Sequence, residues 1–132
     1  MDHVMEIKIY YEDTDCGNVV YYANYLRYME RGRTEYLADR GVPVKALMDQ
    51  GVLFTVSRAE IDYKSSAHYG DTIIVETLLP EITAASLLFE HAMKEKTTGR
   101  LLVESKARLV CVGADMKPKR IPKDVAERLR GK

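Results

Sequence analysis

Two carboxylates and a glycine lie close together near the amino end of the chain, in the segment from Asp13 through Asp15 to Gly17. They fall between a stretch of alternating apolar residues and a long segment with helical periodicity. A carboxylate held just before a helix, beside backbone N–H groups that lack an acceptor, can attack or hydrate a carbonyl, and those N–H groups can bind the carbonyl oxygen. These residue types in this order are the minimum equipment of an acyl-transfer site.

A plainer interpretation exists for each residue of this segment. Asp13 and Asp15 can form Asx turns and cap the helix, and we expect Asp13 to shape the turn. Gly17 is expected to adopt a positive φ and to let an acyl group approach the backbone, although an ordinary tight turn would also use it. Cys16 has no candidate base near it in the sequence and is interpreted as a small turn residue.

The segments around this motif predict a strand and a helix. Residues 5–11 alternate between apolar and polar types, the period of a half-buried strand. A helix is predicted over residues 20–40, with Asn18 or Asn24 as its N-cap and Gly41 at its end. Gly32 costs this helix about 1 kcal/mol relative to alanine, which a close approach of the helix to a sheet would explain. The predicted apolar face holds Tyr22, Tyr25, Leu26, Met29, Gly32, Tyr36 and Leu37.

The rest of the chain is mainly of strand type. A short helix over residues 43–50 comes first, followed by strands over 54–64, 72–79, 86–96 and 100–112 and a short terminal helix over 122–130. A hairpin turn is expected at residues 97–99. This order predicts an α+β fold in which one long helix packs against an antiparallel sheet, as a single domain over residues 1–132.

Composition excludes several classes of partner and site. The formal net charge of zero gives no reason to expect nucleic acid or an anionic membrane surface as a partner. Two cysteines and three histidines have neither disulfide-framework density nor metal-ligand spacing. No apolar run resembles a signal peptide or a membrane span. We therefore expect a cytoplasmic protein with no metal.

A long motif runs from the first predicted strand into the helix, namely Tyr-Glu-Asp-Thr-Asp from residue 11, then Gly17, Val-Val-Tyr-Tyr from residue 19, Asn24-Tyr25 and Glu30-Arg31 with Arg33-Thr34-Glu35. This motif resembles the 4-hydroxybenzoyl-CoA thioesterase family, and within it the YbgC-type, Tol–Pal-associated branch. The likeness is strong over residues 7–37 and extends more loosely over nearly the whole chain. It implies the hotdog fold, a five-stranded antiparallel sheet wrapped around one long central helix. It also implies homodimers, often paired into homotetramers, with substrate sites between subunits.

The resemblance also assigns roles to individual residues. Asp15 matches the aspartate that acts on the thioester carbonyl as nucleophile or as general base, and the backbone N–H of Tyr22 matches the amide that polarises this carbonyl. Two positions depart from the pattern. Tyr22 stands where many Tol–Pal-type relatives have histidine, and Ser66 stands where relatives have proline in the loop that borders the coenzyme A path.

The remaining candidates are expected to touch the substrate. Gly17 and Val20 lie beside the proposed acid, and Tyr25 could line the acyl pocket, although most of the tyrosines are expected in the core or at subunit contacts. Glu30 could face the site, or could instead form a helix-spaced ion pair with Arg33. Lys64, at the end of a predicted strand, is the candidate for the phosphates of coenzyme A.

These observations together predict an acyl-CoA thioesterase that releases a free acid and coenzyme A without a metal or redox cofactor. The alternatives are a non-catalytic module that binds acyl thioesters, and a hydratase or dehydratase, which would need a His/Asp pair across the site. Acyl carrier protein could replace coenzyme A as the carrier. Aromatic, short-chain and long-chain acyl groups all remain open.

Overall fold

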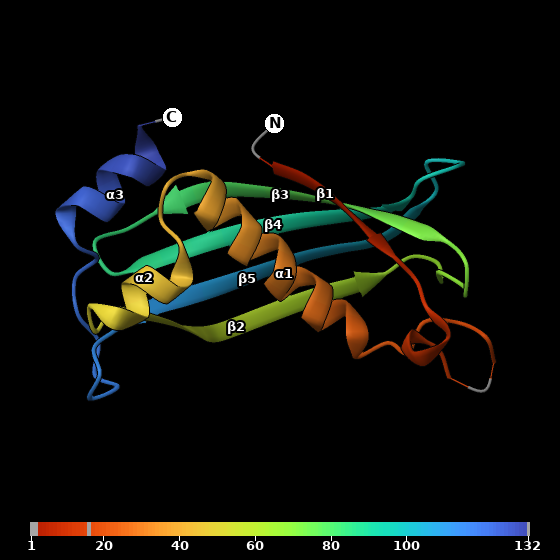
Figure 1. The fold of residues 1–132 in the computed structure, drawn as a ribbon, viewed down its shortest axis with the longest axis horizontal. Helices are drawn as coiled ribbons and strands as arrows, with labels where there is room; N and C mark the ends of the chain where they lie inside the picture. Colours follow the sequence, from red (N-terminus) through yellow and green to blue (C-terminus); the bar gives the residue numbers. More distant parts are fainter. Residues whose placement is uncertain (1–2, 16, 132) are drawn as a thin grey trace.

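The computed structural model describes residues 3–15 and 17–131 (Figure 1). Five strands, one long helix and two short helices follow the predicted order. A single turn of 3-10 helix, which the sequence did not indicate, follows the first strand. The elements are β1 (His3–Lys8), η1 (Tyr11–Asp13), α1 (Asn24–Asp39), α2 (Val44–Asp49), β2 (Leu53–Tyr63), β3 (Thr72–Ile82), β4 (Ser86–Glu95), β5 (Leu101–Val112) and α3 (Lys123–Arg130).

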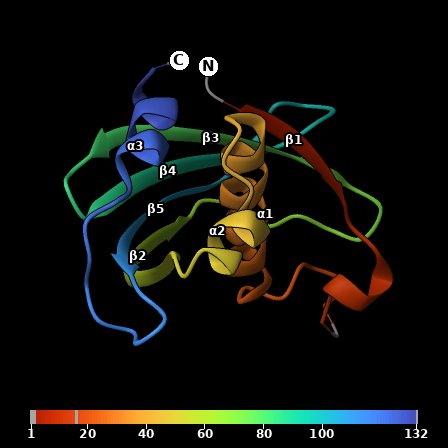
Figure 2. The ribbon, with the colours of Figure 1, turned by 60° about the vertical axis from the view of Figure 1, so that its left-hand side comes forward.

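The five strands form one antiparallel sheet in the order β1-β3-β4-β5-β2, so β1 and β2 are its edges. Figure 2 shows the sheet curving around α1, with β1 and β2 on opposite sides of the helix. Alternate residues of β3, β4 and β5 are buried on the face of the sheet that α1 covers, the period of two expected of strands. The expected α+β arrangement of a five-stranded antiparallel sheet around one central helix is therefore confirmed.

The long helix approaches the sheet most closely at Gly32. A Cβ at this position would lie 2.7 Å from Thr77 Oγ1, 3.2 Å from Val75 Cγ1 and 3.4 Å from His91 Nδ1. The first of these distances is too short for any real Cβ contact. The hypothesis that Gly32 permits close packing of the helix on the sheet is confirmed, which explains why its cost in helix propensity is tolerated.

The predicted start of α1 is wrong by four residues. The helix begins at Asn24 after an N-cap at Ala23, because long-range hydrogen bonds hold the preceding segment in another conformation. The N–H of Val20 donates to Ala67 O at 2.9 Å, and the N–H of Tyr21 donates to Asp13 O at 3.0 Å. The predicted end is correct, since Gly41 has a φ of +78° immediately beyond the helix.

The predicted apolar face of α1 also needs correction. Tyr22 and Leu26 are exposed, whereas Tyr28 and Arg33 are buried on the face that packs against the sheet. Strand β2 is largely exposed along its length, as an edge strand with one neighbour can be. Among the residues described, no helix combines the length and apolar character that crossing a membrane requires.

Candidate active site

The turn around Asp15 is held by its own backbone. The N–H of Asp15 donates to Val19 O at 3.0 Å, and the N–H of Asn18 donates to Asp15 O at 3.0 Å. Asp15 Oδ1 accepts the N–H of Gly17 at 2.9 Å, which is an Asx turn. The side chain is exposed, and no described residue bonds to Oδ2. One carboxylate oxygen is thus used to fix the side chain and the other stays available for chemistry.

Asn18, and not Gly17, is the left-handed residue of this turn. Its φ is 64°, while Gly17 is not among the residues with positive φ. A Cβ on Gly17 would meet Asp15 Oδ1 at an ordinary 3.4 Å. The expectation of a positive φ at Gly17 is therefore wrong. Asparagine tolerates the left-handed region better than most residues, so Asn18 can adopt the positive φ that was expected one residue earlier, at Gly17. Contact of Gly17 with substrate stays a prediction, and Cys16 lies outside the described residues.

Asp13 shapes the segment that leads into the helix. Its Oδ2 accepts the N–H of Tyr10 at 2.8 Å. Its carbonyl oxygen accepts both the N–H of Tyr21, at 3.0 Å, and the side-chain amide of Asn24, at 2.9 Å. These bonds join the strand side of the motif to the first residue of α1. The prediction that Asp13 shapes the turn is confirmed.

Two backbone donors lie just before α1. The N–H groups of residues 24, 25 and 26 donate to the carbonyls three residues earlier. The N–H groups of Tyr22 and Ala23 bond to no described residue. Tyr22 precedes the helix by two residues, and its amide remains free to bind an oxyanion. The residue is 63% exposed.

Asp15 and Tyr22 lie on one loop. The backbone pairing places Asp15 opposite Val19, and Tyr22 lies three residues further along the chain. The structure thus brings the two predicted catalytic residues to the same loop, just before α1.

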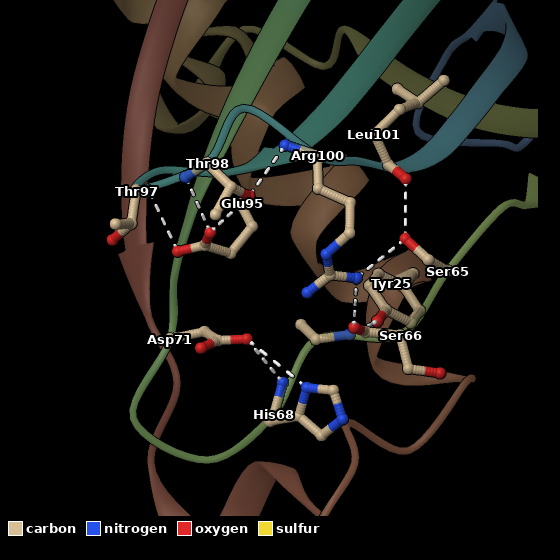
Figure 3. Close-up of polar contacts among 11 residues, drawn as sticks. Tyr25, Ser65, Ser66, His68, Asp71, Glu95, Thr97, Thr98, Arg100 and Leu101 are labelled. Carbon is tan, nitrogen blue, oxygen red and sulfur yellow. Dashed lines mark hydrogen bonds and ion pairs between the residues drawn. The ribbon is translucent and has the colours of Figure 1, made fainter.

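A second loop, residues 64–71, packs against the loop of residues 14–23 that carries the proposed catalytic groups (Figure 3). Ala67 is its fixed point, because its carbonyl accepts the N–H of Val20 at 2.9 Å and its N–H donates to the hydroxyl of Tyr25 at 3.1 Å. Arg100 Nη1 donates to Ser65 Oγ and to Ser66 O, both at 2.9 Å. Sequence reasoning missed Arg100, because nothing in its own segment signals a contact with a loop so far away in the chain.

The predicted binding residues occupy different environments. Val20 and Tyr25 are buried, and burial raises the pKa of Tyr25. The backbone N–H of Val20 and the hydroxyl of Tyr25 both bond to Ala67 of the neighbouring loop. Lys64 lies immediately after β2, partly exposed, with its Nζ 4.0 Å from Glu104 Oε1. This weak pairing leaves most of its ammonium group available to solvent or to a phosphate.

Glu30 lies apart from Asp15, at a cavity of about 160 Å³ between α1, α2 and β2. Its Oε2 accepts the hydroxyl of Thr34 at 3.2 Å. The helix-spaced ion pair proposed with Arg33 does not occur, since Arg33 has no ion pair within the described chain. Neither Asp15 nor Tyr22 lines this cavity. A hollow of about 550 Å³ on the opposite face of the sheet has acidic residues for half of its lining and includes none of the predicted site residues.

Comparison with known proteins places this geometry in a family. The profile of the thioesterase-like superfamily matches residues 10–129. The chain belongs to this superfamily. An acyl-CoA thioesterase YbgC of Haemophilus influenzae is 39% identical to it over 121 residues, which are 90% of this chain and 88% of the relative.

Solved structures agree with this family. A hypothetical protein from Thermus thermophilus superposes with a TM-score of 0.90 at 31% identity, covering 96% of this chain and 95% of the other. The 4-hydroxybenzoyl-CoA thioesterase of Pseudomonas sp. strain CBS-3 superposes with a TM-score of 0.86, covering 96% and 97% of the two chains. At 21% identity, that second likeness shows the fold alone.

These findings confirm the stated resemblance, the hotdog fold and the enzyme class of this thioesterase, a thioester hydrolase. The roles of individual site residues stay predictions. Within the described residues, no group of three His, Cys, Asp or Glu side chains is placed to hold a metal ion. What the site offers chemically is an exposed carboxylate with one free oxygen and a pair of free backbone donors on the same loop.

Proposed function

We propose that this thioesterase hydrolyses acyl-CoA thioesters to a free acid and coenzyme A. Relatives named as acyl-CoA thioesterases, with up to 39% identity, support this substrate class. The observation that carries the assignment to a residue is the state of Asp15. Its Oδ1 is fixed by the N–H of Gly17, while its Oδ2 is exposed and bonded to no described residue.

Asp15 acts on the thioester carbonyl in one of two ways. As a nucleophile, it forms a mixed anhydride and expels the coenzyme A thiolate, and water then cleaves the anhydride. As a general base, it takes a proton from a water molecule that attacks the carbonyl carbon. In both cases the carbonyl oxygen becomes an oxyanion, for which the free N–H of Tyr22 is the proposed donor. For either route the substrate carbonyl must lie within reach of both groups.

The remaining parts of the proposal concern the surroundings of the site. Gly17, Val20, Tyr25 and Glu30 contribute to the acyl-binding region, and Lys64 contacts the phosphates of coenzyme A. The reaction uses no metal or redox cofactor. The protein works in the cytoplasm as a homodimer or homotetramer, in which residues of two subunits complete each site. Acyl carrier protein is the alternative carrier of the acyl group.

Release of free thiol from a panel of acyl-CoA thioesters tests the activity. Asp15→Asn should fold normally and lose turnover by about 10²- to 10⁴-fold, the range for removal of a positioned base or nucleophile. Asp39→Asn, at the far end of α1, is the matched control for the loss of one carboxylate. Comparable turnover in Asp15→Asn would defeat the assignment of this residue.

Single turnover in ¹⁸O-labelled water tests for a covalent intermediate on Asp15. If water cleaves the anhydride at the Asp15 carboxyl carbon, the first product molecule carries an unlabelled oxygen from Asp15 and the ¹⁸O stays on the enzyme. A labelled first product is given by a general base, and also by an anhydride that is cleaved at its acyl carbon. A wild-type protein that binds acyl-CoA without turnover would support the alternative function, a non-catalytic binding module.

A further inference from the structure

Arg33 is a buried cation without a counter-ion. Its side chain lies on the face of α1 that packs against the sheet, and the residue is only 8% exposed. Among the described residues it forms no hydrogen bond and no ion pair. Burial lowers its pKa, and the nearby Glu30 carboxylate opposes that shift. Charged groups are rarely buried without a partner, because desolvation of an unpaired charge is costly.

Arg33 lines the cavity of about 160 Å³ between α1, α2 and β2. Most of this cavity is apolar, and the lining includes Leu37, Leu47, Phe54 and Leu109. Its polar groups come from the turn of α1 that carries Glu30, Arg33 and Thr34. An apolar pocket with a few polar groups at one place is the usual form of a small-molecule site.

We propose that this cavity receives the far end of the acyl group, and that Arg33 binds a carboxylate there. The substrates would then be half-thioesters of dicarboxylic acids. This inference rests on the proposed hydrolysis of acyl-CoA thioesters. The methylene chain of such a group fits the apolar lining, and its terminal carboxylate supplies the counter-ion that Arg33 lacks.

Glu30 is the group that could compete with such a ligand. Its carboxylate is exposed and is already engaged by the hydroxyl of Thr34 at 3.2 Å. An exposed carboxylate is well solvated, so its repulsion of a bound anion is screened by water. Arg33, by contrast, is only 8% exposed, and its hydrogen bonds to a carboxylate are strengthened by this low exposure to water. The balance favours an anionic end group.

The chain length of the substrate depends on the route from Asp15 to the cavity. Arg33 lies about 14 Å along the helix axis from Asn24, at 1.5 Å per residue. Within one subunit only a long acyl group could span this distance. A shorter group would serve if the catalytic loop of a second copy lay beside the cavity. A series of lengths therefore belongs in the test.

The test compares acyl-CoA thioesters in pairs of equal length that differ only in the end group: adipyl against hexanoyl, suberyl against octanoyl, and sebacyl against decanoyl. Wild-type kcat/KM should favour the carboxylate member of at least one pair. Arg33→Gln should lower kcat/KM for that member by about 10- to 100-fold, as expected for loss of a hydrogen bond to a charged group. The methyl-ended member should change little, and Arg33→Lys should retain part of the preference.

Arg31→Gln is the matched control, because Arg31 lies two residues away on the same helix but is exposed. Thermal melting and gel filtration show whether each variant keeps the fold and assembly of the wild type. Turnover of the methyl-ended thioesters without any preference for a carboxylate would overturn the inference, and so would an equal loss for both members in Arg33→Gln. Absence of turnover for every thioester would instead overturn the proposed hydrolysis. In that case, calorimetric titration with adipyl-CoA, suberyl-CoA and sebacyl-CoA decides the role of Arg33, which fails if wild type and Arg33→Gln bind them equally.

Discussion

Gly32 of α1 faces Thr77 of β3 so closely that an added methyl group would lie 2.7 Å from the threonine hydroxyl. Thr77 is fully buried and its hydroxyl lies 3.1 Å from His91 Nδ1, so it cannot move aside cheaply. The helix and the sheet thus meet at a point where only glycine fits. This contact sets the distance between the two layers of the hotdog fold.

Gly32→Ala should destabilise the protein, although alanine is the better helix former. Overpacking of a filled core costs about 1–3 kcal/mol, against a gain of about 1 kcal/mol in helix propensity. We expect a net loss in the free energy of unfolding, measured by urea denaturation. The penalty should shrink in a Thr77→Ala background, where the clashing hydroxyl is absent. An equal penalty in both backgrounds would show that this contact is not the cause.

His91 should make the protein less stable as the pH falls below neutral. Burial, with a smaller effect of the Arg33 charge, lowers the pKa of His91 from 6.5 to about 3. The folded protein keeps the imidazole neutral, whereas the unfolded chain protonates it below pH 6.5. The free energy of unfolding should therefore fall by about 1.4 kcal/mol per pH unit below that value.

His91→Gln should remove this slope between neutral pH and about pH 5. Glu95 does not contribute to the pH dependence of the free energy of unfolding between neutral pH and about pH 5. The N–H groups of Thr97 and Thr98 lower the pKa of Glu95 from 4.5 to about 2, so its stabilisation is lost only at more acidic pH. Denaturation curves at a series of pH values provide the measurement, and an unchanged slope in the variant would refute the assignment to His91.

Tyr63 should position Tyr22, the residue whose N–H is the proposed oxyanion donor. Its hydroxyl donates to Tyr22 O at 3.3 Å, and its ring meets the Tyr22 ring edge-on at 6.2 Å. Tyr63→Phe removes only the hydrogen bond. We expect kcat to fall about threefold to tenfold with little change in KM, as for loss of one neutral hydrogen bond. Tyr69→Phe, on the neighbouring loop, is the control and should leave kcat unchanged.

Arg100 should hold the loop of residues 64–71 against the catalytic loop. Arg100→Met removes both bonds to Ser65 and Ser66 while keeping much of the side-chain volume. The amide of Ala67 should then exchange faster with deuterated solvent, and KM for acyl-CoA should rise. Arg108→Met, which breaks an ion pair with Glu81 on another part of the sheet, is the control. Unaltered exchange at Ala67 would contradict the prediction.

The fold could be read from the sequence because its elements have clear periods. The alternation in residues 86–96 and 100–112 follows directly from burial of one face of each strand under α1. The start of α1 could not be read in this way. Residues 20–23 look helical by composition, but bonds to Ala67 and Asp13 hold them, and no local pattern reports such distant partners.

The parts of the candidate site that depend on contacts between sequence neighbours could be predicted, and those that depend on residues far apart in the chain could not. The turn at Asp15 and the role of Asp13 follow from neighbouring residues. Arg33 was missed as a buried residue because of its charge, although it stands at helical spacing from Met29 and Tyr36 on the buried face. Position on the helix was the better signal there than residue type.

The free edge of β2 is one of the two edges of the sheet to which a strand of another molecule could pair. The strand has a hydrogen-bonded neighbour on one side only, β5, so its other side offers a row of backbone groups to any passing strand. The strand carries charged residues of both signs, namely Arg58, Glu60 and Asp62. Arg58 Nη2 forms an ion pair with Glu60 Oε2 at 2.7 Å. Such charges oppose non-specific strand pairing at this edge and allow pairing only with a surface whose charges are complementary. Replacement of Arg58, Glu60 and Asp62 by neutral residues should therefore increase non-specific pairing of other chains with this edge.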